Sequence, residues 1–184
     1  MKKGLLALAA GAFALGFAEF VVMGIITNIA AGVGVTVPEA GGFISAYAIG
    51  VCFGTLILVF GHSIAPKRLL MLFMLICCAG NALAAVAPSA GMLTVARFIS
   101  GMPHGAFFGT ATIVARELAD KGQESRAVAV MVLGQTLANT IGVPFGTLLA
   151  GMLSWRAAFV FVAAWALCSF VLIWRLVPQV QAVE

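Results

Sequence analysis

The sequence predicts an all-α membrane protein with six transmembrane helices. Of its 184 residues, 63% are hydrophobic and only 9% are charged, whereas a soluble domain is about half apolar and about a quarter charged. The mean hydropathy is +1.16. A spanning helix needs roughly 20 apolar residues, so a chain of this length holds at most about six spans. No room is left for a soluble catalytic domain.

Six apolar stretches define the predicted spans. They cover residues 5–30, 42–60, 69–86, 92–115, 127–153 and 157–176. The connections between them are short, and three contain a proline, at Pro38, Pro66 and Pro88. The alternation of apolar and polar residues that is typical of strands does not compete with this pattern. We therefore expect residues 1–184 to form one six-helix bundle.

The distribution of basic residues predicts the orientation of the bundle. If the N-terminus is cytoplasmic, eight basic residues lie on the cytoplasmic side: Lys2, Lys3, Lys67, Arg68, Arg116, Lys121, Arg126 and Arg175. Only Arg156 lies on the outer side, so the positive-inside rule puts both termini in the cytoplasm. A cleaved signal peptide ending before Glu19 is the alternative. The first apolar run continues to Ala30, which is longer than the apolar region of a signal peptide and favours a span.

The composition and the motifs exclude several classes of function. The net charge of +4 is small and its basic residues are scattered, so no nucleic-acid-binding stripe is present. The four cysteines lie inside apolar runs, where a thiol usually behaves as a small hydrophobic group. Protease serine motifs, Walker loops, metal-spaced clusters and haem signatures are all missing from the sequence. We expect no enzymatic activity, no cofactor and no metal.

Two charged residues lie deep inside the predicted spans. Glu19 is the only acidic residue within a span, and a carboxylate there costs at least about 2.5 kcal/mol. Desolvation disfavours its charged form, which suits a proton carrier. At 1.5 Å per residue, Glu19 and Arg97 both fall in the outer half of the membrane, so they could pair. The alternatives are a structural carboxyl and a structural ion pair that fixes helix register.

The fourth span contains a second titratable residue and a small-residue ridge. His104 follows Arg97 by two helical turns and shares its face, so it could relay protons or stay neutral and hydrogen-bonded. Gly101, Gly105 and Gly109 recur every four residues, which favours close helix packing. Pro103 removes one backbone hydrogen bond and predicts a bend near residues 99–101, for gating or as a purely structural kink.

A polar and small stripe follows the fifth span at helical spacing: Gln135, Asn139, Gly142 and Gly146. Two amides on one face of a membrane helix either line a cavity or join neighbouring helices, and we favour a substrate cavity. Pro144 predicts a kink beside the stripe. Asn81 and Tyr47 are further candidates for the cavity lining, with structural roles as the alternative.

Three segments carry a resemblance to a known family. The segment RFISGMPHGAFFGT, residues 97–110, resembles the fourth-helix signature of the major facilitator superfamily, in particular its drug and sugar efflux branch. LGFAEFVVMGIITNIA, residues 15–30, resembles the first-helix motif of that branch. GQTLANTIGVPFGTLLAG with the following SWRAAF is similar to the antiporter motif of the fifth helix. Within the branch, the chain resembles the AraJ-like arabinose efflux permeases.

The resemblance implies proton-coupled efflux of a sugar or drug-like compound across the inner (plasma) membrane. Glu19, Arg97 and His104 would couple the proton, and the first, fourth and fifth helices would line the cavity. The loop between the second and third spans keeps Gly61, Lys67 and Arg68 of the family pattern but lacks its acidic residue.

Members of the superfamily are built from two six-helix halves, and this chain contains one half without an internal duplicate. The expected partners are therefore the substrate, protons, the lipid bilayer and either a second half or a second copy. The alternative is a truncated, non-transporting half or a membrane assembly protein.

Overall fold

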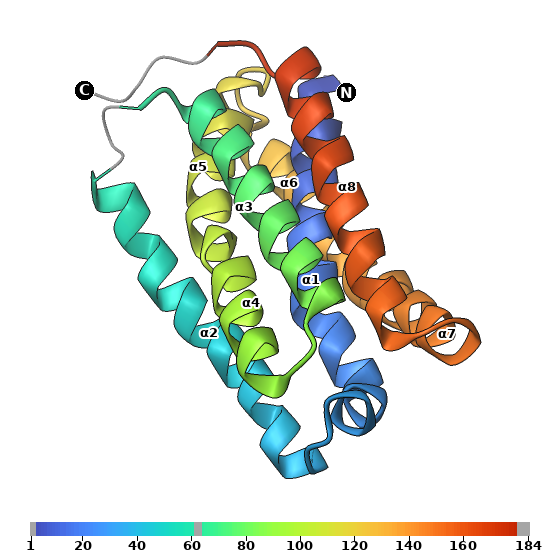
Figure 1. The fold of residues 1–184 in the computed structure, drawn as a ribbon. Helices are drawn as coiled ribbons and strands as arrows, with labels where there is room; N and C mark the ends of the chain where they lie inside the picture. The colour runs from blue at the N-terminus through green and yellow to red at the C-terminus, as the bar shows by residue number, and fades with distance from the viewer. Residues whose placement is uncertain (1–2, 61–63, 180–184) are drawn as a thin grey trace.

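The computed structural model describes residues 3–60 and 64–179, which form a bundle of roughly antiparallel helices (Figure 1). Within this part of the chain all regular structure is helical. The elements are α1 (Lys3–Val33), α2 (Val37–Phe60), α3 (Pro66–Val86), α4 (Ala90–Gly101), α5 (Pro103–Glu117), α6 (Glu124–Leu137), the π-helical turn η1 (Ala138–Gly142), α7 (Val143–Met152) and α8 (Trp155–Leu176). The Gly61 match to the family loop lies outside the described residues.

These elements build six rods. α4 and α5 are separated only by Met102 and form the fourth rod, and α6, η1 and α7 run on without interruption as the fifth. Five helices of the described chain are long and apolar enough to cross a membrane: α1, α2, α3, the α6 to α7 rod and α8. α4 and α5, the two segments of the fourth rod, are each shorter than 18 residues. The predicted all-α class is confirmed, and each predicted span overlaps one rod.

α1 lies in the middle of the bundle. It packs against α6 and α8, while α2 packs against α4, and α3 against α8. Apolar side chains on all sides of α1, among them Leu8, Leu15, Phe17 and Val21, are fully buried. A helix that is apolar all round is expected to lie in the interior. α1 begins and α8 ends at the same end of the bundle (Figure 1).

Two of the rods are irregular beside a proline. Pro103 starts α5, and the amide of Met102 donates long hydrogen bonds of 3.3 Å to the carbonyls of both Phe98 and Ile99. The break therefore falls one residue after the predicted region. In the fifth rod the irregularity predicted beside Pro144 takes the form of the π-helical turn η1, which gives the proline ring room against the preceding turn.

α1 has an irregularity that the sequence does not predict. Ile25 has non-helical backbone angles (φ −124°, ψ 16°) inside the helix. No proline stands near it.

The connections at the end of the bundle opposite the termini are held by side chains. Thr36 and Glu39 form a reciprocal capping box at the start of α2: the Thr36 amide donates to Glu39 Oε2 (2.7 Å), and the Glu39 amide donates to Thr36 Oγ1 (3.4 Å). Arg156 Nη2 donates to the Ala87 carbonyl at the end of α3 (2.6 Å). Arg156 thereby joins the start of α8 to the end of α3.

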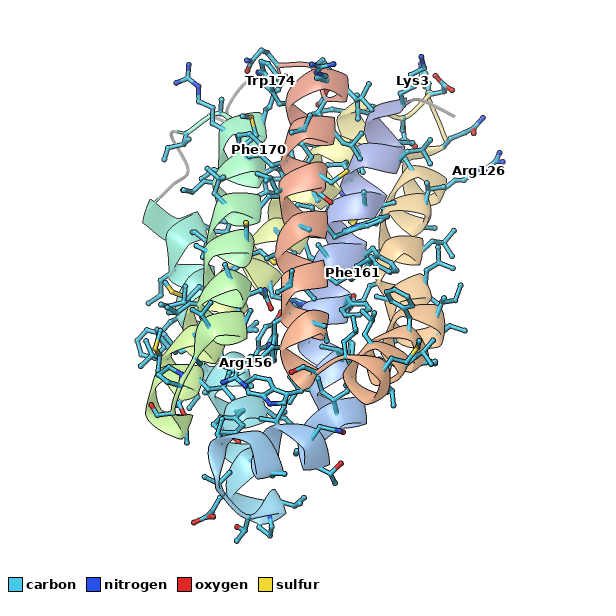
Figure 2. The ribbon with its side chains drawn as sticks, turned by 45° about the vertical axis from the view of Figure 1, so that its right-hand side comes forward. Lys3, Arg126, Arg156, Phe161, Phe170 and Trp174 are labelled. Atoms are coloured by element: carbon cyan, nitrogen blue, oxygen red, sulfur yellow. The ribbon has the colours of Figure 1, made fainter. Side chains whose placement is uncertain are left out.

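The basic residues divide between the ends as the orientation requires, and this gives a first prediction. Lys3 and Arg126 lie toward one end of the bundle and Arg156 at the other (Figure 2). In a cysteine-free background, Thr36→Cys is expected to react with a membrane-impermeant thiol reagent in intact cells, whereas Gln123→Cys is not. Both positions are exposed at opposite ends. The reverse labelling pattern would overturn the predicted orientation.

Candidate functional site

Glu19 lies in the middle of α1, and its carboxylate faces the fourth and fifth rods. Its side chain is 31% exposed, and Oε2 lies 3.6 Å from His104 Nε2 on α5. That contact is an ion pair only when the imidazole is protonated. On the α6 side, the Gln135 side chain approaches the carboxylate as a hydrogen-bond donor. Glu19 therefore has a polar neighbour on each adjoining rod.

His104 connects Glu19 to a buried tyrosine. The hydroxyl of Tyr47 on α2 lies 2.9 Å from His104 Nδ1 and 3.3 Å from the carbonyl oxygen of Leu15. The hydroxyl has one proton for these two acceptors. When Tyr47 donates to Leu15, Nδ1 carries the imidazole proton and Nε2 is free to accept one from Glu19. When Tyr47 donates to Nδ1, Nε2 carries the proton and faces the carboxylate.

Arg97 of α4 is one of the most deeply buried side chains, with 1% exposure. Its Nη1 donates to the carbonyl of Ala18 (2.8 Å), directly beside Glu19. The guanidinium carbon lies 4.4 Å from the centre of the Tyr47 ring and 5.8 Å from that of Phe159, so aromatic faces partly replace the lost water. Nε and Nη2 have no hydrogen-bond partner.

Glu19 and Arg97 form no ion pair within 4.0 Å in the described part of the chain, and the carboxylate faces His104 instead. Arg97 lies within electrostatic range of Glu19, because it contacts the backbone of the preceding residue. Direct pairing in another conformation stays a prediction.

The predicted cavity residues divide into two groups. Gln135 is half-buried and Asn139 is exposed within this chain, and both lie on the rod that packs against α1. Asn81 and Tyr47 are enclosed in the core instead, with 0% and 2% exposure. In this conformation only the fifth-rod amides face open space, so the cavity role of Asn81 and Tyr47 has no geometric support here.

The predicted small residues lie at close helix contacts. A Cβ on Gly101 would overlap the Tyr47 backbone, and one on Gly105 would lie 3.2 Å from Thr55, so this ridge faces α2. Gly109 continues it toward Leu58. On the fifth rod, Gly142 and Gly146 leave room for side chains of α1, chiefly the Phe17 ring.

Sequence reasoning missed the complementary glycines on α2. A Cβ on Gly50 would overlap the carbonyl of Phe98, and one on Gly54 would overlap the carbonyl of Met102. Gly50 and Gly54 are spaced four residues apart, the same small-residue signal that identified the α4 and α5 ridge. Applied to the second span, that signal would have found them.

A separate cavity of about 180 Å³ lies at the end of the bundle where the chain begins, between α1, the end of α5 and the start of α6. Leu5, Asp120, Gln123 and Arg126 are among its lining residues, and none of the predicted site residues is. Among the described residues, no cluster of His, Cys, Asp and Glu could hold a metal ion.

Comparison with known proteins relates the whole chain to one family. Residues 8–184 match the profile of the Major Facilitator Superfamily. AraJ from Escherichia coli (strain K12) is 41% identical over 98% of this chain and 46% of its own length. The inner membrane transport protein YdhP from the same organism is 41% identical over 95% of this chain and 45% of its own length. A chloramphenicol resistance protein from Streptomyces lividans is 33% identical over 99% of this chain and 47% of its own length.

Solved structures agree in fold. The peptide transporter POT in complex with sulfate superposes with a TM-score of 0.80 at 15% identity, covering 94% of this chain and 37% of that one. The human organic anion transporter MFSD10 (TETRAN) gives a TM-score of 0.71 at 15% identity, covering 96% of this chain and 47% of that one. The chain thus spans about half the length of the curated relatives it matches.

Proposed function

The chain belongs to the major facilitator superfamily, and from this premise we propose that it is the six-helix half of a proton-coupled efflux transporter. The transporter moves a small molecule, a sugar or a drug-like compound, out of the cell as protons enter. The observation that carries the proposal is the Glu19 carboxylate, which lies in the middle of a spanning helix, half-buried and in contact with a buried imidazole.

Proton binding at Glu19 is supported by the chemistry of its neighbours. When Glu19 is protonated, its hydroxyl can donate to His104 Nε2. When it is ionised, the Gln135 amide, a protonated His104 and the nearby Arg97 charge stabilise the carboxylate. The Tyr47 hydroxyl lets the imidazole exchange tautomers by turning between Leu15 and Nδ1. Glu19 is thereby the proton carrier, and His104 with Tyr47 is the relay.

Arg97 favours release of the proton. The guanidinium stays charged at every physiological pH because its intrinsic basicity is so high. A movement that brings it nearer the carboxylate favours the ionised form of Glu19, and a movement away favours the protonated form. The position of Arg97 thus controls the charge of Glu19. A transporter that opens to the two sides of the membrane in turn needs such a site, which binds a proton in one state and releases it in the other.

The substrate cavity is formed on the side of Gln135 and Asn139. An amide in hydrocarbon lacks hydrogen-bond partners and costs free energy. The exposed polar residues of the fifth rod, Thr136, Asn139 and Thr140, therefore face a water-filled cleft closed by a second bundle. Because the same rod carries Gln135 beside Glu19, substrate bound there lies next to the proton site. The relatives named for transport and for chloramphenicol resistance favour this class of cargo.

The second bundle has three possible sources: further residues of the same polypeptide, a second copy of this chain, or a separately encoded half. The two halves of the superfamily are related by rotation about the membrane normal, so two copies can take the same arrangement with both N-termini on one side.

The test measures the mass of the assembled protein and the movement of protons that it catalyses. The 184-residue chain is reconstituted in vesicles with an imposed pH gradient, and proton movement is followed on addition of chloramphenicol or L-arabinose. We expect compound-induced proton movement that a protonophore abolishes, together with the mass of a dimer in nanodiscs. A stable monomer without proton movement would exclude a second copy of this chain as the second bundle and would overturn transport by the 184-residue chain alone, leaving a non-transporting half or a membrane assembly protein.

A further inference from the structure

Two buried side chains near the site have complementary unpaired atoms. Arg97 is 1% exposed, and its donors Nε and Nη2 have no hydrogen-bond partner. Asn81 of α3 is 0% exposed, and its acceptor Oδ1 has none either. Leaving such groups unpaired away from water destabilises the folded state, and more so for a charged group. A native bundle therefore needs a partner for both.

The packing of α3 on α4 brings these two residues into one cluster. A Cβ on Gly80, next to Asn81, would come within 2.6 to 2.8 Å of the Ser100 backbone and Cβ. Ser100 lies one turn after Arg97, and its hydroxyl donates to the Arg97 carbonyl (3.0 Å). The two helices therefore approach closely beside Asn81 and one turn from Arg97.

Cys77 gives a second, independent link. The Asn81 Nδ2 group donates to the Cys77 carbonyl (2.8 Å) and lies 3.6 Å from Cys77 Sγ. Cys77 in turn lies within electrostatic range of both Arg97 and Tyr47. Because the amide nitrogen is held by the Cys77 carbonyl, the oxygen of Asn81 is the end left free to accept.

We infer that Asn81 is a positioning residue with which Arg97 forms a hydrogen bond in a second arrangement of the guanidinium. In the first arrangement Nη1 donates to Ala18, beside Glu19. In the second, Nε or Nη2 donates to Asn81 Oδ1. The charge of Glu19 selects between them: the ionised carboxylate attracts the guanidinium, and the neutral acid releases it to Asn81. The link to proton coupling rests on the proposed function, whereas the hydrogen bond itself does not.

The experiment observes Arg97 directly. The full chain, which has six arginines, is labelled with 15N-arginine and placed in nanodiscs, and the Nε–H and Nη–H signals of Arg97 are identified by their loss in Arg97→Lys. Asn81→Leu, similar in size but without an acceptor, is expected to shift at least one of these signals and to speed its hydrogen exchange about tenfold or more. Asn81→Asp, which keeps the acceptor, is expected to leave exchange as slow as in the parent chain or slower. Glu19→Gln, which mimics the neutral acid, is expected to slow the hydrogen exchange of Arg97. The double variant with Asn81→Leu is expected to lose this slowing.

Ser169→Ala is the matched control. Ser169 is also fully buried with an unpaired oxygen, but it lies ten residues after Phe159 on α8, about 15 Å away along the helix axis. An Arg97 signal that stays within twofold of the parent rate in Asn81→Leu, or that responds equally to Ser169→Ala, would overturn the inference. Because no transport is measured, failure here is distinct from failure of the proposed function.

Discussion

Glu19→Gln is expected to reduce proton-coupled efflux to the level of protein-free vesicles. Glutamine keeps the size of the side chain and can still hydrogen-bond to His104 and Gln135, but it cannot bind and release a proton. Exchange of labelled for unlabelled compound across the membrane, which needs no net proton movement, is expected to persist. The measurement is the ratio of proton-driven efflux to exchange in the same vesicles.

Glu39→Gln is the matched control for this prediction. Glu39 is an exposed carboxylate that caps α2 by bonding to Thr36. Losing its charge weakens the capping box at the surface and leaves the interior of the bundle unchanged. Equal loss of efflux in both variants, or full efflux in Glu19→Gln, would contradict the role of Glu19 as proton carrier.

Among glycine-to-alanine substitutions in the described bundle, Gly54→Ala is expected to be the most destabilising. The added Cβ would overlap the carbonyl oxygen and carbon of Met102. These atoms belong to the backbone, so no side-chain rotation relieves the overlap, and α2 has to move away from α4 and α5. We expect a loss of about 3 kcal/mol in the free energy of unfolding, at the upper end of the usual cost of overpacking. The unfolding midpoint in an SDS titration, followed by circular dichroism, measures it.

A second glycine-to-alanine substitution on α2 provides the comparison. Gly42 lies in the first turns of α2, and a Cβ there meets nothing within 4 Å. Gly42→Ala is expected to be neutral or to stabilise the helix by up to about 1 kcal/mol, because alanine loses less backbone freedom than glycine. Equal midpoints for the two variants would show that α2 and the fourth rod do not touch through Gly54.

The rods of this fold were predictable because the bilayer constrains them so strongly. A backbone in hydrocarbon has to satisfy its own hydrogen bonds, so a long apolar run can only be a helix. The break beside Pro103 was also predictable, since a residue without an amide hydrogen cannot continue the hydrogen-bond ladder. The rise per residue predicts a similar level for Glu19 and Arg97, and Arg97 bonds to the Ala18 carbonyl beside Glu19.

The rotation of each helix about its own axis was not predictable in the same way. It depends on which side chains interlock with the neighbouring helix, and hydropathy contains no such information when all faces are apolar. Glu19 therefore lies against His104 and not against Arg97, and Asn81 lies in the core and not on a cavity wall.

The division of the fourth rod at Met102 has a mechanical consequence for the site. Arg97 belongs to α4 and His104 to α5, so the guanidinium and the imidazole stand on opposite sides of a joint. Phe98 and Met102 around that joint are in backbone contact with Gly50 and Gly54. α2 thus packs closely against both segments, one on each side of the joint. A change in the angle at this joint would alter the separation of the two basic groups.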